Sequence, residues 1–205
     1  HGCGADLYGG VGIYVAYTDG TIVAHNLLHD LPYTAISVGM MWGGSETICR
    51  NNLVEYNHIY DIMKKMGDGG GVYTLGYQPG TVIRKNLIHD IGRNRFARGG
   101  PYAGLYFDNT SSGILIEDNI VYGIETSIGC EHVLIGFHSK DLIFRRNVFV
   151  TSQSDAKVFN YYVAKEEEST FEYNTTVLQA DWQRPVGLDD RMGLEPRYRK
   201  TLLGR

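Results

Sequence analysis

The sequence predicts an all-β fold, a right-handed parallel β-helix of about six coils, and three observations lead to it. A short apolar pattern around an asparagine recurs every 27 to 33 residues, and repeats of this length are typical of solenoids. The strand-like segments are short and are separated by turns rich in glycine, asparagine and aspartate. No long stretch shows the helical period, so β coils are favoured over helix pairs.

The repeated pattern has two apolar residues, two polar residues, an asparagine and usually two more apolar residues. It covers residues 22–30, 53–61, 82–90, 115–123, 143–151 and, weakly, 170–178, and its asparagines are Asn26, Asn57, Asn86, Asn119, Asn147 and Asn174. Asparagine suits a corner because it tolerates left-handed backbone and its amide can bond to the next asparagine in the stack. We therefore expect the six asparagines to form one row along the axis.

A further run of β-branched and aromatic residues lies between consecutive patterns, which makes about three short strands per repeat. These runs are residues 35–41, 71–75, 104–107, 132–137 and 158–163. Such a unit cannot bury its apolar face alone, whereas stacked copies bury a continuous core. A β-propeller also repeats at this length, but each of its blades needs four antiparallel strands. Three strands per repeat therefore favour the β-helix.

The chain is expected to form one elongated domain over residues 1–205. Its content of 43% hydrophobic and 12% aromatic residues is enough for one full core. Residues 9–17 resemble the last strand of an earlier coil, so we expect a piece of a longer protein with an uncovered N-terminal edge. After Asn147 the pattern weakens, and residues 181–205 are expected to form an irregular tail that covers the last coil.

Charge and composition exclude several classes of protein. A net charge of -4 offers no basic face for nucleic acid, and no apolar run approaches the length of a membrane span. Cys3, Cys49 and Cys130 lie far apart, and this odd count without a close pair argues against a disulfide framework or a zinc site. We therefore expect neither a cofactor nor a metal.

Two aspartates near matching tyrosines are the candidate catalytic residues. Asp68 precedes Gly69–Gly71 and Tyr73, and Asp108 follows Tyr106 in the next repeat. Hydrolysis of a glycosidic bond needs one carboxylic acid to protonate the leaving oxygen and one carboxylate as base or nucleophile. Either aspartate alone suits a turn or the end of a strand. The pair, with its tyrosines, predicts a catalytic role.

The alignment of the two tyrosines predicts how the acids meet. Asp108 lies two residues after Tyr106 and so on the same outward face, whereas Asp68 lies five residues before Tyr73 and has the opposite parity. We expect Gly69–Gly71 to form a bulge or tight turn that re-aims Asp68. The carboxyl groups should then share one groove roughly 5 to 9.5 Å apart, a range that covers retaining and inverting enzymes. The offset along the strand favours the inverting end.

Four side chains are predicted to bind the substrate: Trp42, Tyr73, Tyr106 and His138. Trp42 stands beside two glycines, where it is hard to bury, and suits a platform for a sugar ring or packing on a neighbouring loop. His138 ends the strand of the coil after Asp108, just before a turn. Glu131 and His132 are alternatives to His138.

Four segments match a known pattern: His29–Asp30 with Tyr33–Gly39, Asp68–Gly76 with Gln78–Thr81, Leu105–Asp108 with Ser111–Gly113, and Gly193–Tyr198. In these segments the chain resembles bacterial right-handed β-helix glycosidases, and most closely glycoside hydrolase family 141, which includes α-L-fucosidase and xylanase activities. The resemblance implies a secreted, periplasmic or cell-surface enzyme that degrades plant or complex carbohydrates of the fucoside or xyloside type. It also implies that Asp68 and Asp108 are the catalytic pair.

Two other functions remain possible for this fold. A polysaccharide lyase or epimerase must neutralise a uronate, with acids around Ca²⁺ or with basic groups. The loop 93–102 contains three arginines, which could serve that purpose or could hang over the acids as part of a binding site. A non-catalytic carbohydrate-binding β-helix needs only the aromatic residues. Turnover of neutral glycosides distinguishes these alternatives from a hydrolase.

Overall fold

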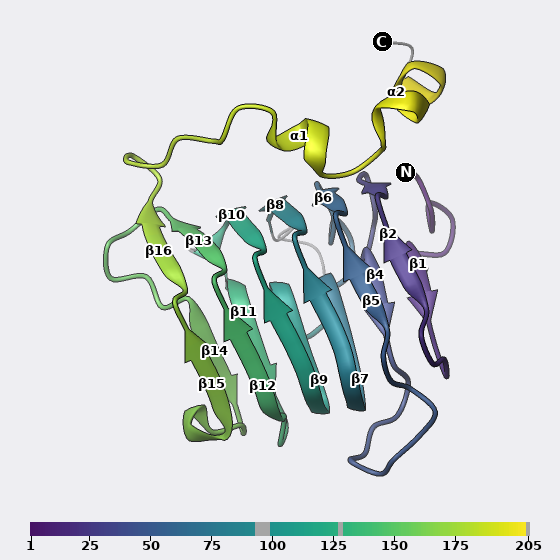
Figure 1. Cartoon of the computed structure of the whole chain (residues 1–205), viewed down its shortest axis with the longest axis vertical. Helices are drawn as coiled ribbons and strands as arrows, with labels where there is room; N and C mark the ends of the chain where they lie inside the picture. Colours follow the sequence, from purple (N-terminus) through teal and green to yellow (C-terminus); the bar gives the residue numbers. More distant parts are fainter. Residues whose placement is uncertain (93–98, 127–128, 204–205) are drawn as a thin grey trace.

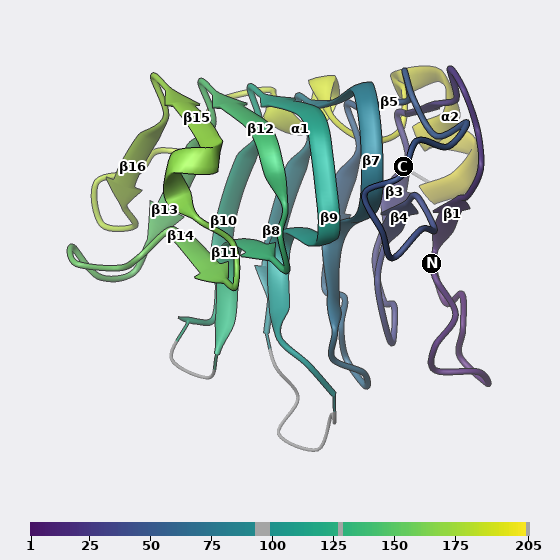
Figure 2. The same cartoon turned by 90° about the horizontal axis from the view of Figure 1, so that it is seen from below.

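The structure is a computed structural model, which describes residues 1–92, 99–126 and 129–203. The chain winds into a solenoid whose coils add short strands to three long faces (Figures 1 and 2). On each face the strands of neighbouring coils pair in parallel. The predicted parallel β-helix is therefore confirmed, and a propeller of antiparallel blades is excluded.

Each face is a stack of strands from successive coils. The first face contains β1 (Ile13–Val15), β4 (Ile36–Val38), the first halves of β7 (Gly69–Arg84) and β9 (Tyr102–Glu117), β11 (Cys130–Gly136) and β14 (Phe159–Tyr162). The second face contains β2 (Ile22–Ala24), β5 (Leu53–Glu55), the second halves of β7 and β9, β12 (Lys140–Arg145) and β15 (Ser169–Glu172). The third face contains β3 (Leu27–Leu28), β6 (His58–Tyr60), β8 (Leu87–Ile91), β10 (Ile120–Ile124), β13 (Val148–Thr151) and β16 (Thr175–Leu178).

The strands β7 and β9 carry the residues around the two candidate acids. Each is 16 residues long and passes from the first face to the second. Their register is regular up to Leu75, which lies opposite Asp108, and then shifts, so that residues 109–111 of β9 lie opposite Gly76. A β-bulge therefore follows Asp108 directly.

The prediction of a bulge at Gly69–Gly71 is wrong. These glycines lie within β7 and pair with β9 in regular register. A Cβ atom at Gly70 would lie 2.2 Å from the carbonyl oxygen of Ala103, and one at Gly71 would lie 2.6 Å from that of Gly104. The glycines therefore allow two coils to pack closely, and they do not change the direction of the strand.

The ladder asparagines form one row between the second and third faces, as predicted. The amide oxygen of Asn57 accepts hydrogen bonds from the backbone and side-chain nitrogens of Asn26, at 3.0 and 2.9 Å. The same pattern continues through the row to Asn174. Left-handed backbone occurs one residue earlier, as at Tyr56 and Lys85, so asparagine is required for its amide and not for its backbone.

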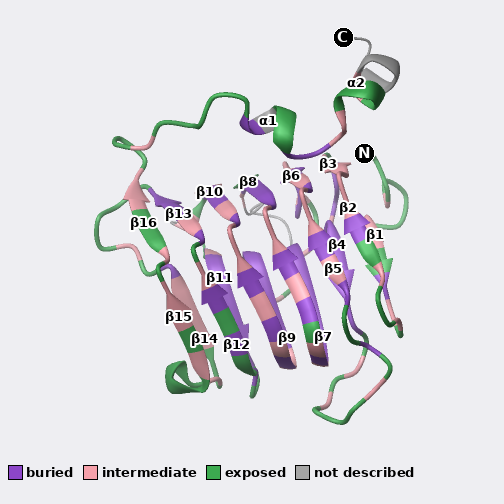
Figure 3. Ribbon diagram, in the orientation of Figure 1, coloured by how far each residue is buried: buried purple, intermediate pink, exposed green. Residues whose placement is uncertain are grey.

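Apolar side chains from the three faces fill one core along the axis. The side chains of Phe107, Phe144 and Phe149 are fully buried, and Phe144 packs against Phe159 and Phe171 at ring distances of 5.1 and 5.4 Å. Burial is most continuous along β7, β9 and β11 (Figure 3). This core fixes the register of the strands beneath the candidate acids.

The prediction that the C-terminal tail covers the last coil is wrong. It contains the helices α1 (Leu188–Arg191) and α2 (Pro196–Leu203), preceded in the chain by the 3₁₀ helix η2 (Glu166–Glu168), and it runs back along the third face (Figure 1). Leu188 and Met192 pack with Tyr122, and the backbone nitrogen of Gly193 donates to the carbonyl of Tyr56 at 2.7 Å. The tail therefore packs on the apolar outer side of the third face. None of the described helices is long and apolar enough to cross a membrane.

Candidate active site

A pocket of about 780 Å³ lies on the outer side of the first face. This volume is typical of sites for small ligands. The pocket is lined by Trp42, Asp68, Tyr73, Gly100, Pro101, Tyr106, Asp108, Asn109, Glu131, Leu134, Phe137, Asn160, Tyr161 and Tyr162. Asp68 and Asp108 therefore share one pocket, as the sequence predicts.

Asp108 is held rigidly at the last regular position of β9 before the bulge. It is 4% exposed, and its two carboxyl oxygens accept hydrogen bonds from the Tyr73 hydroxyl and from the backbone nitrogen of Asn109, each at 2.8 Å. The Ser111 hydroxyl donates to the Asp108 carbonyl at 2.7 Å, within the bulge. A Cβ atom at Gly136 would lie 3.0 Å from Oδ1 of Asp108, so this glycine on the next coil leaves room for the carboxyl group.

Asp68 reaches the pocket through its own backbone conformation. It directly precedes β7 and has a φ of 67°, a left-handed conformation that aspartate tolerates better than most residues. The Tyr33 hydroxyl donates to the Asp68 carbonyl at 2.6 Å, and the Asp68 nitrogen donates to the carbonyl of Pro101 at 2.9 Å. Tyr106 donates a long hydrogen bond of 3.4 Å to the carboxyl group. The backbone conformation of Asp68 itself directs its side chain into the pocket, whereas the prediction assigned this role to the glycines that follow it.

The two carboxyl groups have different environments. Asp68 keeps solvent access at the edge of the pocket, so a ligand can reach it, yet the protein packed around its carboxyl group raises its pKa. Burial is the main cause, the negative charge of Asp108 is the second, and the hydrogen bond from Tyr106 acts in the opposite direction. Asp68 therefore stays protonated to a higher pH than an ordinary aspartate.

The two predicted substrate-binding tyrosines contact the acids directly. The rings of Tyr73 and Tyr106 pack edge to face at 5.1 Å and are mostly buried. Burial and the charge of Asp108 raise the pKa of both hydroxyls, which therefore remain hydrogen-bond donors. Their observed contacts orient Asp108 and Asp68. Contact between these tyrosines and a substrate stays a prediction.

Trp42 lies where a sugar platform is expected. It follows β4 in the chain, lines the pocket and is 77% exposed. Of the arginine-containing loop 93–102, residues 93–98 lie outside the described part of the chain, whereas Gly100 and Pro101 line the pocket. The exposed indole is available to stack on a ligand.

His138 does not share the pocket with the acids. It lines a separate pocket of about 610 Å³, together with Thr110 and Lys140. The register explains the difference, since Phe107 lies opposite Ile135 and the next position, opposite Asp108, is Gly136 and not His138. The predicted grouping of His138 with the acid pair is therefore wrong.

The two alternatives to His138 differ in position. Glu131 lines the pocket, and burial raises the pKa of its carboxyl group. His132 is buried in the core, where a ring nitrogen lies 2.9 Å from the carbonyl oxygen of Val150, and burial lowers its pKa. Glu131 is thus a third carboxyl group in the pocket.

Comparison with known families identifies the fold. The family model described as "Right handed beta helix region" matches residues 1–177. The chain belongs to this family. The predicted hand of the coil is thereby confirmed. No curated protein sequence matches the chain.

This right-handed β-helix is also similar to a solved structure named "Glycoside hydrolase". The two chains are 25% identical, with a TM-score of 0.64, and the match covers 94% of this chain and 26% of the other. The chain thus spans about a quarter of the length of that protein. The likeness supports a glycosidase-like β-helix.

Several pocket residues of the β-helix were not predicted from the sequence: Leu134, Phe137, Asn160, Tyr161 and Tyr162. The contact of the Tyr33 hydroxyl with the Asp68 carbonyl was not predicted either. The ladder holds a signal for some of them. Tyr73, Tyr106 and Leu134 each lie 13 residues before a ladder asparagine, and Asn160 lies 14 residues before Asn174. Counting back from the last four asparagines, Asn86 to Asn174, therefore identifies one outward row across successive coils.

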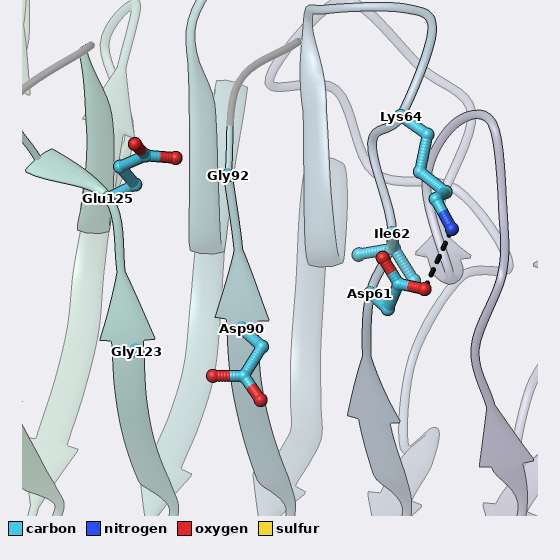
Figure 4. A pocket seen from close by; sticks show the side chains of 7 residues that line it. All are labelled: Asp61, Ile62, Lys64, Asp90, Gly92, Gly123 and Glu125. Carbon is cyan, nitrogen blue, oxygen red and sulfur yellow. Dashed lines mark hydrogen bonds and ion pairs between the residues drawn. The ribbon is translucent and has the colours of Figure 1, made fainter.

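A different pocket also contains carboxyl groups (Figure 4). It is lined by Asp61, Ile62, Lys64, Asp90, Gly92, Gly123 and Glu125, and it has no aromatic lining residue among those the structure describes. Lys64 pairs with Asp61 at 2.7 Å and with Asp30 at 2.9 Å. The described residues include no group of three metal ligands. This pocket is best explained as a solvated edge with ion pairs.

Proposed function

We propose that this chain provides the active site of a glycoside hydrolase that acts on neutral oligosaccharides or polysaccharides. One observation carries the proposal: Asp68 and Asp108 share one aromatic-lined pocket, and the pKa of Asp68 is raised by burial and by the charge of Asp108. Glycoside hydrolysis needs a protonated acid beside an ionised carboxylate, and different environments produce such a pair.

The two aspartates divide the reaction between them. Asp68 is the general acid, which donates its proton to the glycosidic oxygen as the leaving group departs. Asp108 accepts hydrogen bonds on both oxygens and acts as the carboxylate, either activating a water molecule or attacking the anomeric carbon. Tyr73 holds Asp108 in the orientation that either step requires.

The charge of the pocket favours a neutral sugar. Its described lining includes the carboxyl groups of Asp68, Asp108 and Glu131 and no lysine or arginine. The negative charge of Asp108 would repel a uronate bound beside it, which disfavours a lyase or epimerase acting on acidic polysaccharides. The resemblance to glycoside hydrolase family 141 favours a fucoside or xyloside, and the likeness to a solved structure named "Glycoside hydrolase" supports the hydrolysis of a glycosidic bond. Trp42 supplies an exposed ring for the apolar face of a sugar.

The proposal is tested with Asp68→Asn and Asp108→Asn in the intact protein. Both changes keep the shape of the side chain and remove the ionisable group. We expect each to lower kcat on aryl fucosides, aryl xylosides or neutral oligosaccharides by about 10²- to 10⁴-fold. The control is Asp90→Asn, which changes an aspartate of the same left-handed conformation on the third face.

The possible results separate the three functions. Full activity of both asparagine variants would overturn the acid pair. Sugar binding without turnover by the unmodified protein would mean a carbohydrate-binding β-helix. An unsaturated product from an acidic polysaccharide would instead mean a lyase.

A further inference from the structure

The pocket with the acid pair continues beyond the two aspartates. Glu131 and Asn160 line it, and the same two residues line a smaller pocket of about 290 Å³. The smaller pocket extends to Ala156 and Lys157, in the segment before β14. Because both pockets share these two side chains, the pockets form one groove. A ligand held at the acids can therefore extend towards the later coils.

Glu131 and Asn160 form a polar pair at the junction of the two pockets. The Asn160 side chain donates hydrogen bonds to the Glu131 carboxyl group at 2.5 Å and to the Lys157 carbonyl at 3.2 Å. The other Glu131 oxygen and the Asn160 amide oxygen accept no hydrogen bond from side chains in the described part of the chain. Two acceptor oxygens therefore remain on residues that line the groove, where they can accept from hydroxyl donors.

The register of the coils sets the distance from Asn160 to the acids. Asn160 lies opposite Leu134, and Leu134 lies opposite Tyr106, which contacts Asp68. Neighbouring coils are spaced by about 4.8 Å, so Asn160 is about 10 Å from Tyr106 along the axis. A sugar held at the acids therefore leaves room for a second sugar before Asn160.

Aromatic rings flank the space between the acids and the pair. Tyr161 and Tyr162 of β14 line the pocket, and Tyr162 is 57% exposed. Its ring packs edge to face against Phe137 at 4.8 Å, which limits its movement. Fixed rings beside hydrogen-bond acceptors suit a sugar, which has both apolar faces and hydroxyl edges.

We propose that Glu131 and Asn160 form a second sugar subsite, which binds the hydroxyl groups of the neutral sugar next to the one held at Asp68 and Asp108. The ligand is an oligosaccharide that lies along the axis of the β-helix. The inference rests on the proposed function for the position of the cleaved bond. The subsite itself depends on binding, which is measured independently of cleavage.

The test compares ligands of one and two sugar units in Glu131→Gln and Asn160→Ala proteins. Calorimetry with neutral oligosaccharides, in proteins that also carry Asp108→Asn, measures binding without hydrolysis. We expect Glu131→Gln to weaken binding of two-unit ligands about tenfold, since hydrogen bonds to a charged group are the stronger kind. Asn160→Ala should also weaken it, because the change removes an amide acceptor and the hydrogen bond that orients Glu131. When Asp108 is intact, kcat/KM should fall less for one-unit aryl glycosides than for two-unit substrates in both variants. Glu125→Gln, in the separate pocket of Figure 4, is the matched control.

Each further result decides between the two proposals. Weaker two-unit binding in a protein that never cleaves a glycoside would support the subsite and overturn the hydrolase. Cleavage with unchanged two-unit binding in both variants would overturn the subsite alone. A loss of kcat on one-unit substrates in Glu131→Gln would place Glu131 in the reaction and overturn its role as a subsite residue. Thermal melts confirm that each variant is folded.

Discussion

Asp68 is the residue whose environment decides the chemistry. Burial and the negative charge of Asp108 both disfavour its ionised form, so its folded pKa lies above the usual 3.8. The reaction needs Asp68 protonated, and the raised pKa extends the protonated form to higher pH. The alkaline limb of the kcat/KM profile should therefore lie above the pH at which a free aspartate ionises.

Replacing Asp108 by asparagine should lower the pKa of Asp68. The change removes the neighbouring negative charge, which is the second cause of the shift, while burial, the first cause, remains. We expect the Asp68 pKa to fall and yet stay above 3.8. Carbon-13 NMR titration of the carboxyl groups in the two proteins measures this difference. An unchanged pKa would show that the two groups do not interact.

Tyr73 should matter more than Tyr106 for activity. Tyr73 donates a hydrogen bond of 2.8 Å to buried Asp108, whereas Tyr106 donates one of 3.4 Å to accessible Asp68. A hydrogen bond to a charged group contributes about 1.5–3 kcal/mol. Tyr73→Phe should therefore lower kcat roughly tenfold or more, and Tyr106→Phe clearly less. Tyr14→Phe, an exposed tyrosine of the same face, is the control, and equal effects of all three changes would contradict this ranking.

The asparagine row is the element that holds the coils in register. Asn119 is fully buried, and its amide bonds to Asn147 and to the carbonyl of Ile83 while accepting from Asn86. Asn174 ends the row and is more accessible. When Asn174 is replaced, water can therefore satisfy more of the groups that lose a hydrogen bond.

We predict that Asn119→Ala lowers the free energy of unfolding by about 2–4 kcal/mol, because it leaves several buried groups without partners. Asn174→Ala should cost about half as much or less. Urea unfolding followed by circular dichroism measures both changes. Equal losses at the two positions would show that the interior of the row is no more important than its end.

The strand β9 shows how a local irregularity creates the site. The residues before Asp108 follow the regular register with β7, and the three residues after it lie opposite the single residue Gly76. The bulge supplies the Asn109 nitrogen to Asp108. Bulges next to functional residues commonly re-aim side chains in this way.

The tail joins distant coils of the solenoid. It crosses the third face from the last coil to Tyr56, with Leu188 and Met192 buried against the coils beneath. Stability in a solenoid comes mainly from contacts between neighbouring coils, so a segment that spans several of them adds long-range cooperativity. Removing its anchor should destabilise the protein without unwinding the coils.

We predict that Leu188→Ala lowers the free energy of unfolding by about 2 kcal/mol, the lower end for a buried leucine, because the site lies near the surface. The far-ultraviolet spectrum of the folded protein should not change. Val186→Ala, which shortens a fully exposed side chain two residues earlier, is the control and should be neutral. Melting temperatures measure both, and equal melting of the two variants would show that Leu188 does not anchor the tail.

The sequence alone predicts the fold, the row of asparagines and the pair of acids. These features depend on patterns of apolar and polar residues that repeat along the chain, and stacking requires each coil to present the same pattern. Tyr73 and Tyr106 could be aligned for this reason, and Asp108 takes the outward position that the alignment predicts.

Only the tertiary structure shows the left-handed backbone at Asp68, the bulge after Asp108, the pair of Glu131 with Asn160 and the path of the tail. Each of these depends on contacts between residues about 30 or more positions apart, or on a one-residue change of register that reverses the direction of a side chain. A repeated pattern specifies which residues stack, and it does not specify where a strand departs from the pattern. The departures are where the candidate site lies.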